Sequence, residues 1–192
     1  METETAETAY EIVTEPTTES EGLGRYTAVF QNTAFESQIK DVVIPKLSVE
    51  GYHILVTDYT AGNATTGIEA ETLYSGEVTF TVSCDNACLV AIVNADGIYT
   101  VLPCTTTDDE HSFTVNVADA DVTIVIAIKG DANLNGAREA KDATFAAQAA
   151  AGKRTFTALQ QLAMDGNGDG VFDSKDATYA AQVESGKRSY KW

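Results

Sequence analysis

Two segments near the end of the chain carry oxygen-bearing side chains at alternating positions of a short loop that contains glycine. Loop 1 begins at Asp131 and closes at Asp142, and loop 2 repeats the pattern 34 residues later, from Asp165 to Asp176. Oxygen ligands at positions 1, 3, 5, 7, 9 and 12 of a twelve-residue loop, with glycine at position 6, are the arrangement that surrounds a calcium ion. One match could be a polar turn, but two in fixed register predict two Ca²⁺ sites.

The predicted ligands in each loop combine carboxylates, side-chain amides and one backbone carbonyl, and position 9 acts through a water molecule. They are Asp131, Asn133, Asn135, Ala137, Glu139 and Asp142 in loop 1, and Asp165, Asn167, Asp169, Val171, Asp173 and Asp176 in loop 2. Loop 2 carries four carboxylates and loop 1 carries three, and Arg138 and Lys141 add positive charge to loop 1. We therefore expect loop 2 to bind Ca²⁺ more tightly.

The duplication extends past the loops into the segments after them. The letters DATFAAQ at 142–148 recur as DATYAAQ at 176–182, and GKRTF at 152–156 recurs as GKRSY at 186–190. Each copy therefore predicts a loop, an alanine-rich helix, and a glycine stop followed by cations that suit a helix C-terminus. A β-branched strand pattern at 121–128 precedes loop 1, so no helix enters it, whereas residues 157–164 can form a short helix before loop 2.

With these features, residues 130–192 resemble a dockerin, the calcium-binding module that attaches enzymes and scaffold subunits to cohesin modules in cellulosomes. The likeness rests on the paired loops, on Asp at position 12, and on the missing first entering helix. The chain departs from the commonest dockerin pattern at Asn135 and Glu139, in helices without large aliphatic residues, and in the absence of a Ser-Thr pair at loop positions 10 and 11. The cohesin class therefore does not follow. Residues 23–129 resemble the X-type β modules that accompany some dockerins.

The resemblance implies a non-catalytic, calcium-dependent adaptor that binds a cohesin of a scaffoldin or cell-surface anchoring protein in a cellulosome-like, polysaccharide-degrading complex. It also implies an extracellular protein, secreted or attached to the bacterial cell surface through a cohesin, that is a monomer before it binds. One alternative is an EF-hand-like calcium sensor, although the alanine-rich helices offer no large aliphatic stripe to expose. Another is a carbohydrate-binding β module with a structural calcium domain, which a glycan pull-down with residues 23–129 would distinguish.

Positions that match between the copies without being needed by the metal suggest a partner-binding surface on the helices. Small residues allow close approach, and Gln, Lys and Arg at the margin can bond to an acidic partner. The resemblance suggests that either helix could lead in docking. The alternative is a duplication that has not diverged, with cations that only complement the helix dipole. The predicted surface comprises Ala140, Lys141, Thr144, Ala147, Gln148, Lys153, Arg154, Ser174, Lys175, Thr178, Ala181, Gln182, Lys187 and Arg188.

Residues 23–129 show mostly short strand patterns separated by turns, which suggests an immunoglobulin-like sandwich. A hairpin turn at 94–97 should place Leu89 opposite Leu102, a short helix is expected within 35–43, and residues 58–76 indicate a loop. The expected strands are 25–30, 52–57, 77–83, 89–93, 98–102, 112–117 and 122–128. The predicted fold class is an all-β immunoglobulin-like sandwich followed by a small all-α duplicated calcium-loop-helix module.

Charge is distributed unevenly along the chain. Residues 1–22 hold seven acids and no base, so we expect a disordered linker, attached upstream to something larger. The 192 residues carry a net charge of −17, whereas residues 130–192 balance eight acids with eight bases and would reach about +4 with two Ca²⁺ bound. The acidity elsewhere argues against nucleic acid or an anionic membrane as a partner, and no apolar run approaches a membrane span.

Nothing in the sequence indicates an enzyme. The two histidines, His53 and His111, lie in no catalytic motif and fit polar positions at strand edges. A glycosidase would need a larger scaffold and sugar-stacking aromatic residues. The only tryptophan, Trp192, is either an exposed end or part of a clasp against the opposite end of the repeat or the β region.

The three cysteines, Cys84, Cys88 and Cys104, all lie in the β region. Their spacing does not fix a disulfide, although the hairpin favours Cys88 with Cys104 if a bond forms. A zinc site is less favoured, because three thiols without a nearby histidine fall short of four ligands.

Overall fold

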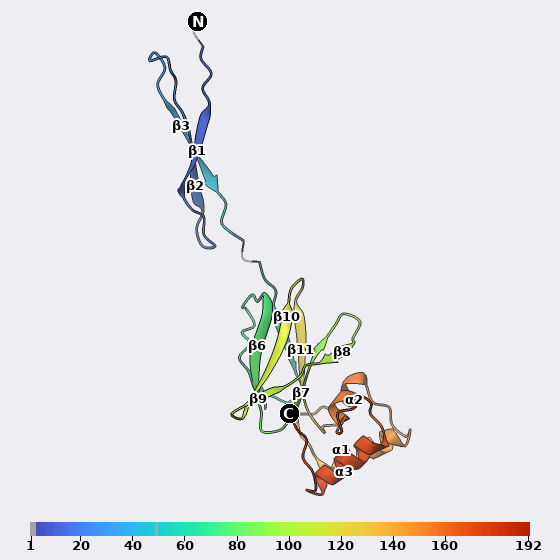
Figure 1. Cartoon of the computed structure of the whole chain (residues 1–192). Coiled ribbons are helices and arrows are strands. Elements are labelled where there is room, and N and C mark those ends of the chain that lie inside the picture. The colour runs from blue at the N-terminus through green and yellow to red at the C-terminus, as the bar shows by residue number, and fades with distance from the viewer. Residues whose placement is uncertain (1–2, 49) are drawn as a thin grey trace. The chain divides into compact units, whose positions relative to one another are not determined.

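The computed structural model of the chain describes residues 3–48 and 50–192. The structure is mostly β-sheet, with three short helices at its C-terminal end (Figure 1). It divides into two compact units, residues 1–50 and 51–192, so a boundary falls inside the region expected to form one β domain. Among the described residues, no helix is long and apolar enough to cross a membrane.

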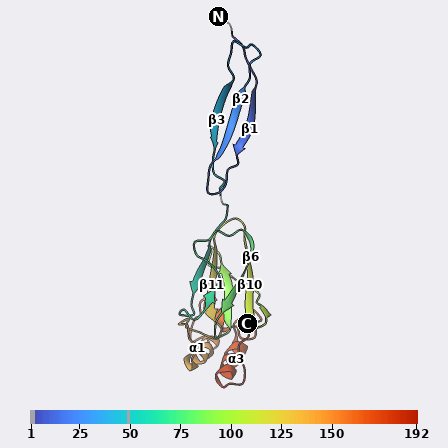
Figure 2. The same cartoon turned by 90° about the vertical axis from the view of Figure 1, so that its left-hand side faces the viewer.

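Unit 1 is a three-stranded antiparallel sheet, whose strands lie side by side in Figure 2. Its order is β1 (Thr8–Thr14), β2 (Gly22–Ala28) and β3 (Gln38–Ile44). Tyr10 pairs with Tyr26 across β1 and β2, with ring centroids 4.8 Å apart. Arg25 on β2 faces Asp41 on β3, and its Nε donates to Oδ1 at 2.7 Å. These cross-strand pairs fix the register of a sheet that buries little.

Two expectations for this region are wrong. Residues 1–22, expected as a disordered linker, contain β1, because Tyr10 and Ile12 alternate with polar residues and pair with β2. The helix expected within 35–43 is replaced by β3. Val42 and Val43 favour extended backbone, and antiparallel pairing with β2 outweighs the helical spacing of the apolar residues.

Unit 2 contains two four-stranded sheets that share one core. The strand order of the first sheet is β5 (Thr65–Thr66), β6 (Gly76–Ser83), β10 (Glu110–Val117) and β9 (Thr105–Thr107). The strand order of the second sheet is β4 (Ile54–Asp58), β11 (Val122–Ile128), β7 (Cys88–Val93) and β8 (Tyr99–Val101). Phe80 and Phe113 of the first sheet stack at 5.9 Å, in the same core cluster as Ile124 and Ile126 of the second. The strands expected between 52 and 128 are all present, with ends shifted by at most two residues.

The hairpin at 94–97 is confirmed, but its register differs by one residue from the expectation. Val93 pairs with Tyr99, and the N–H of Leu102 donates to the carbonyl of Val90 instead of lying opposite Leu89. The difference arises because the Asn94 side chain accepts from the N–H of Ile98 at 2.8 Å, which draws Ile98 into the turn. All three cysteines, including the favoured pair Cys88 and Cys104, are free thiols, and burial raises the pKa of Cys88.

The helices are α1 (Ala140–Ala150), α2 (Ala158–Met164) and α3 (Ser174–Glu184), as expected from the repeat. Helices α1 and α3 pack together through small buried residues, among them Ala146 and Ala180. Helix α2 places Leu159 and Ala163 in a cluster with Leu89 and Val125 of the β4–β11–β7–β8 sheet. The helical part is therefore joined to the β4–β11–β7–β8 sheet by a hydrophobic cluster that is separate from the core between the two sheets.

Replacing Ile126 by alanine tests the core between the two sheets, because the side chain belongs to that cluster and is only 1% exposed. We expect a loss of about 2–5 kcal/mol in the free energy of unfolding of unit 2, since a cavity replaces packed atoms. Urea denaturation followed by Trp192 fluorescence measures it. The control Ile98→Ala, at a side chain that is 62% exposed, should cost under about 0.5 kcal/mol. Equal losses in the two variants would contradict the assigned core.

Candidate metal centre

Loop 1 and loop 2 fold around equivalent hydrogen bonds. The position 1 carboxylate of Asp131 accepts from the N–H of Gly136 at 2.7 Å, and that of Asp165 accepts from the N–H of Gly170 at 2.8 Å. The backbone φ angles of Gly136 and Gly170 are positive, 83° and 85°, and residues that have a β-carbon rarely adopt such angles. The duplication in the sequence is therefore also a duplication of loop structure.

The position 12 carboxylates close each loop onto the helix that comes after it. In loop 1, Asp142 accepts from the N–H of Ala132 at 3.2 Å and from that of Glu139 at 2.7 Å. In loop 2, Asp176 accepts the two equivalent bonds at 3.1 and 2.9 Å. Each carboxylate also lies in the first turn of α1 or α3, where the helix dipole favours negative charge.

Loop 1 contains buried oxygens that a cation would satisfy. Within the described residues, Oδ1 of Asn133 is buried and accepts no hydrogen bond, while its Nδ2 donates to Asp142 at 3.2 Å. Asp131 is fully buried, and desolvation raises the pKa of Asp142, with the charges of Asp131 and Glu139 adding to the effect. Buried oxygens of this kind are costly without a positive partner. Carboxylate and amide oxygens are also the ligands that Ca²⁺ prefers, so the residues fit this ion.

Lysine at position 11 competes for carboxylates in both loops. Lys141 forms an ion pair with Glu139, and Lys175 lies 3.4 Å from Asp173 and 3.9 Å from Asp169. A hydrogen bond from the Lys141 ammonium lowers the pKa of Glu139, whereas the pKa of Asp173 is lowered mainly by the backbone N–H of Lys175. The positive charge of Lys141 was expected to weaken loop 1, whereas the same effect of Lys175 on loop 2 was not expected, although the two lysines occupy the same loop position.

Carboxylates alone do not assemble a metal site in this structure. In the described ranges 3–48 and 50–192, no three His, Cys, Asp or Glu side chains gather closely enough to hold an ion. The carboxylates of the loops accept backbone N–H groups or pair with lysine instead. Amide and backbone carbonyl oxygens, at positions 3, 5 and 7 of loop 1 and at positions 3 and 7 of loop 2, would add to the carboxylates in coordinating a bound Ca²⁺.

The β region supports loop 1, which the sequence analysis missed. Nδ2 of Asn63 donates to the carbonyl of Gly136 at 3.1 Å, and a β-carbon at Gly136 would collide with Thr60 and Ala61. Asp58 organises this support by accepting the N–H groups of Thr60 at 2.7 Å and Gly62 at 2.9 Å. The available signal was the Asp58-x-Thr60 turn pattern. At Gly170 of loop 2, a β-carbon would meet open space.

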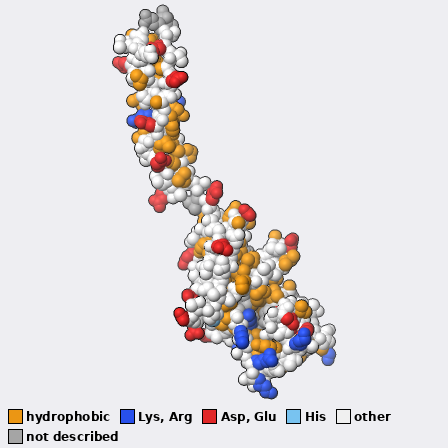
Figure 3. Space-filling model, in the orientation of Figure 1, with side chains coloured by type: hydrophobic (Ala, Val, Ile, Leu, Met, Phe, Trp, Pro, Cys, Tyr) orange, Lys and Arg blue, Asp and Glu red, His pale blue; other side chains and the backbone are white. Residues whose placement is uncertain are grey.

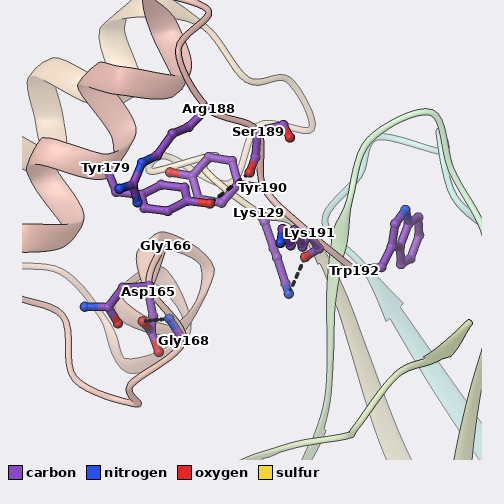
Figure 4. A pocket seen from close by; sticks show the side chains of 11 residues that line it. Lys129, Asp165, Gly166, Gly168, Tyr179, Arg188, Ser189, Tyr190, Lys191 and Trp192 are labelled. Atoms are coloured by element: carbon purple, nitrogen blue, oxygen red, sulfur yellow. Dashed lines mark hydrogen bonds between the residues drawn. The ribbon is translucent and has the colours of Figure 1, made fainter.

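The C-terminal tail is held against the β region. Of the two alternatives for Trp192, an exposed end or a contact with the rest of the chain, the structure has the contact with the β region. The Trp192 ring stacks on His111 with centroids 3.9 Å apart. Nζ of Lys129 donates to the carbonyl of Lys191 at 2.7 Å (Figure 4). Tyr190 is buried, with the guanidinium of Arg138 5.5 Å from its ring centre. The tail therefore links the second repeat to the end of β11.

The predicted partner-binding residues lie at the surface of the helical part. Twelve of the fourteen are exposed, and Arg154 and Gln182 are half-buried. Lysine and arginine side chains are prominent over this part of the molecule (Figure 3). Arg154 lies 3.8 Å from the ring centre of Phe145, and its counterpart Arg188 lies 4.9 Å from that of Tyr179. The two copies thus present stacked cations in equivalent places, whereas Lys141 and Lys175 pair with carboxylates of loop 1 and loop 2.

Comparisons with known proteins add no relative: no protein-family model, curated protein or solved structure matches the chain.

Calorimetry of Asp131→Ala and Asp165→Ala tests the two loops separately. We expect two Ca²⁺ sites in the parent chain and one in each variant, with the tighter site lost in Asp165→Ala because loop 2 has more carboxylates.

Lys175→Ala should raise the Ca²⁺ affinity of loop 2 about 2- to 5-fold in the same calorimetric measurement, since it removes an exposed competing ion pair. Lys187→Ala, an equal charge change outside the loop, is its control. Two sites persisting in Asp165→Ala would refute the ligand assignment.

Proposed function

We propose that this chain is a calcium-dependent adaptor whose dockerin-like C-terminal part binds a cohesin module of a scaffoldin or anchoring protein. The observation that carries the proposal is the pair of loops 34 residues apart, whose position 1 and position 12 carboxylates make equivalent hydrogen bonds. Bound Ca²⁺ would supply the positive charge that holds these oxygens together. In this proposal the two sheets of unit 2 form an immunoglobulin-like sandwich, to which α2 joins the helical part by packing Leu159 and Ala163 against the β4–β11–β7–β8 sheet.

The distribution of charge supports docking on an acidic partner. Seven of the eight carboxylates in residues 130–192 are predicted calcium ligands, and Glu184 is the remaining one. Two Ca²⁺ ions would neutralise the loops and leave the exposed cations of both repeats without acidic neighbours. Complementary charge speeds encounter and fixes orientation, and small residues such as Ala147 and Ala181 allow close approach.

Chelation should reduce the helical content of the C-terminal part. Helices α1 and α3 have 11 residues each, which is short for a stable isolated helix, and their alanine-rich contact buries little. We expect EDTA to weaken the helical circular dichroism signal and Ca²⁺ to restore it. The control Asp142→Ala with Asp176→Ala should not respond to Ca²⁺. An unchanged spectrum of the parent chain in EDTA would contradict the coupling of metal binding to folding.

Capture of the full chain on a panel of immobilised cohesins tests the partner. We expect capture by at least one cohesin in Ca²⁺ and none in EDTA. Charge reversal of Lys153 with Arg154, or of Lys187 with Arg188, should weaken binding, and reversal of all four should abolish it. Lys46→Glu, at an exposed lysine of unit 1, is the control and should bind normally.

Two outcomes separate the parts of this proposal. If one double reversal abolishes capture while the other is silent, the repeats do not dock interchangeably. If reversal of all four residues is silent, this surface is not the interface.

A further inference from the structure

The two repeats differ in the path of the chain after their last equivalent aromatic residue. After Phe156 the chain enters α2, which folds back over loop 1. Nε2 of Gln160 donates to the carbonyl of Ala132 at 2.7 Å, and Leu134 packs in the cluster that contains residues of α2. After Tyr190, the counterpart of Phe156, the tail turns to the β region instead. The place over loop 2 that corresponds to α2 is therefore open to solvent.

An open cleft of about 640 Å³ occupies this place over loop 2 (Figure 4). Gly166 and Gly168, the counterparts of Ala132 and Leu134, line one side, and residues 188–192 line the other. In the described part of the chain, no hydrogen bond reaches the carbonyl of Gly166, although its counterpart on Ala132 accepts from Gln160. The carbonyl of Gly166 is therefore available to a ligand in the cleft, whereas the equivalent carbonyl of Ala132 is bonded to α2.

The chemistry of the cleft is polar and cationic. Glycine at 168 replaces Leu134, so the apolar contact that holds α2 is missing. Lys129, Arg188 and Lys191 line the cleft together with one acidic side chain, that of Asp165. Because Asp165 is a predicted ligand at position 1 of loop 2, bound Ca²⁺ would neutralise it and leave the three cations unopposed.

The cationic wall of the cleft is held in place before any ligand binds. The guanidinium of Arg188 lies over the Tyr179 ring, and the Tyr179 hydroxyl donates to the carbonyl of Ser189 at 2.8 Å. Lys129 is half-buried and donates to the carbonyl of Lys191, which leaves other N–H groups of its ammonium for a ligand. Fixed donors lose less conformational entropy when they bind an anion.

We propose that this cleft binds an acidic peptide segment of a partner protein when loop 2 holds Ca²⁺. The segment would lie over loop 2 as α2 lies over loop 1. The inference deepens the proposed function, since it rests on the calcium site of loop 2, but it does not depend on the partner being a cohesin. Carboxylates of the segment pair with Lys129, Arg188 and Lys191, and a backbone N–H donates to Gly166.

Titration of the ¹⁵N-labelled full chain with hexaglutamate, in a large excess of Ca²⁺, tests the cleft. We expect saturable amide shifts at Gly166, Gly168 and residues 188–192. Arg188→Gln with Lys191→Gln should weaken hexaglutamate binding about 10-fold or more, which corresponds to about 1.4 kcal/mol. The spectrum of each variant also reports whether the chain is folded.

Lys40→Gln with Lys46→Gln is the matched control, because it removes two exposed cations that neither line the cleft nor belong to the predicted partner-binding surface. It should change hexaglutamate affinity less than about 2-fold, the effect of exposed charges that do not contact the ligand. Equal weakening in both double variants, no saturable shift, or equal binding in EDTA would overturn the proposal. Capture by a cohesin without hexaglutamate binding refutes only the cleft, and hexaglutamate binding without cohesin capture refutes only the proposed partner.

Discussion

Two buried carboxylates, Asp142 and Asp176, determine how the C-terminal part of the chain is built. Each accepts N–H groups from the beginning of its loop and from the residue that precedes its helix, so it fixes the loop and the helix start together. Their exposure is 1% and 0%, which makes the loops unfavourable to fold without positive charge nearby. Apolar contacts hold the helices to each other, because Ala146 and Ala180 share a buried cluster with Phe156 and Met164. The hydrogen bonds of the loop carboxylates therefore determine where each helix begins, and the apolar cluster packs the helices together.

The two loops, which are the proposed Ca²⁺ sites, are held in shape by different contacts. Loop 1 has fewer carboxylates, but Asn63 and the segment around Thr60 hold its turn against the β region. Loop 2 has more carboxylates and no such support at Gly170. Contacts that hold the loop 1 turn in place reduce the conformational entropy that the loop loses when it binds an ion. The additional carboxylate of loop 2 increases its electrostatic attraction for the ion. The two copies of the repeat therefore place their loops in unequal environments.

The features that the sequence predicted are those whose determinants lie close together along the chain. The ligand spacing predicted both loops and their helices, and the β-branched run at 122–128 predicted β11 at its observed bounds. Contacts between distant segments were not predictable in this way. The strand that contains Tyr10 depends on pairing with the strand that contains Tyr26. Leu159 and Val125 meet in one cluster, but the sequence pattern around each residue indicates only that its side chain is buried, not which residue it contacts. The one-residue error in the hairpin came from a single side-chain hydrogen bond of Asn94, which composition does not reveal.

The parallel pairing of β4 with β11 determines how unit 2 bears mechanical load. The chain enters this sheet through β4 and leaves it through β11 directly into loop 1, with Lys129 and Gly130 between them. If the helices bind a partner as proposed, tension between that partner and the chain before β4 would pull these neighbouring strands in opposite directions along their length. Their five paired positions, from Ile54 with Val122 to Asp58 with Ile126, are then strained in shear and together, not opened one at a time. Shear across a bonded strand pair resists rupture better than unzipping, so this topology suits a connector that must stay folded while it is pulled.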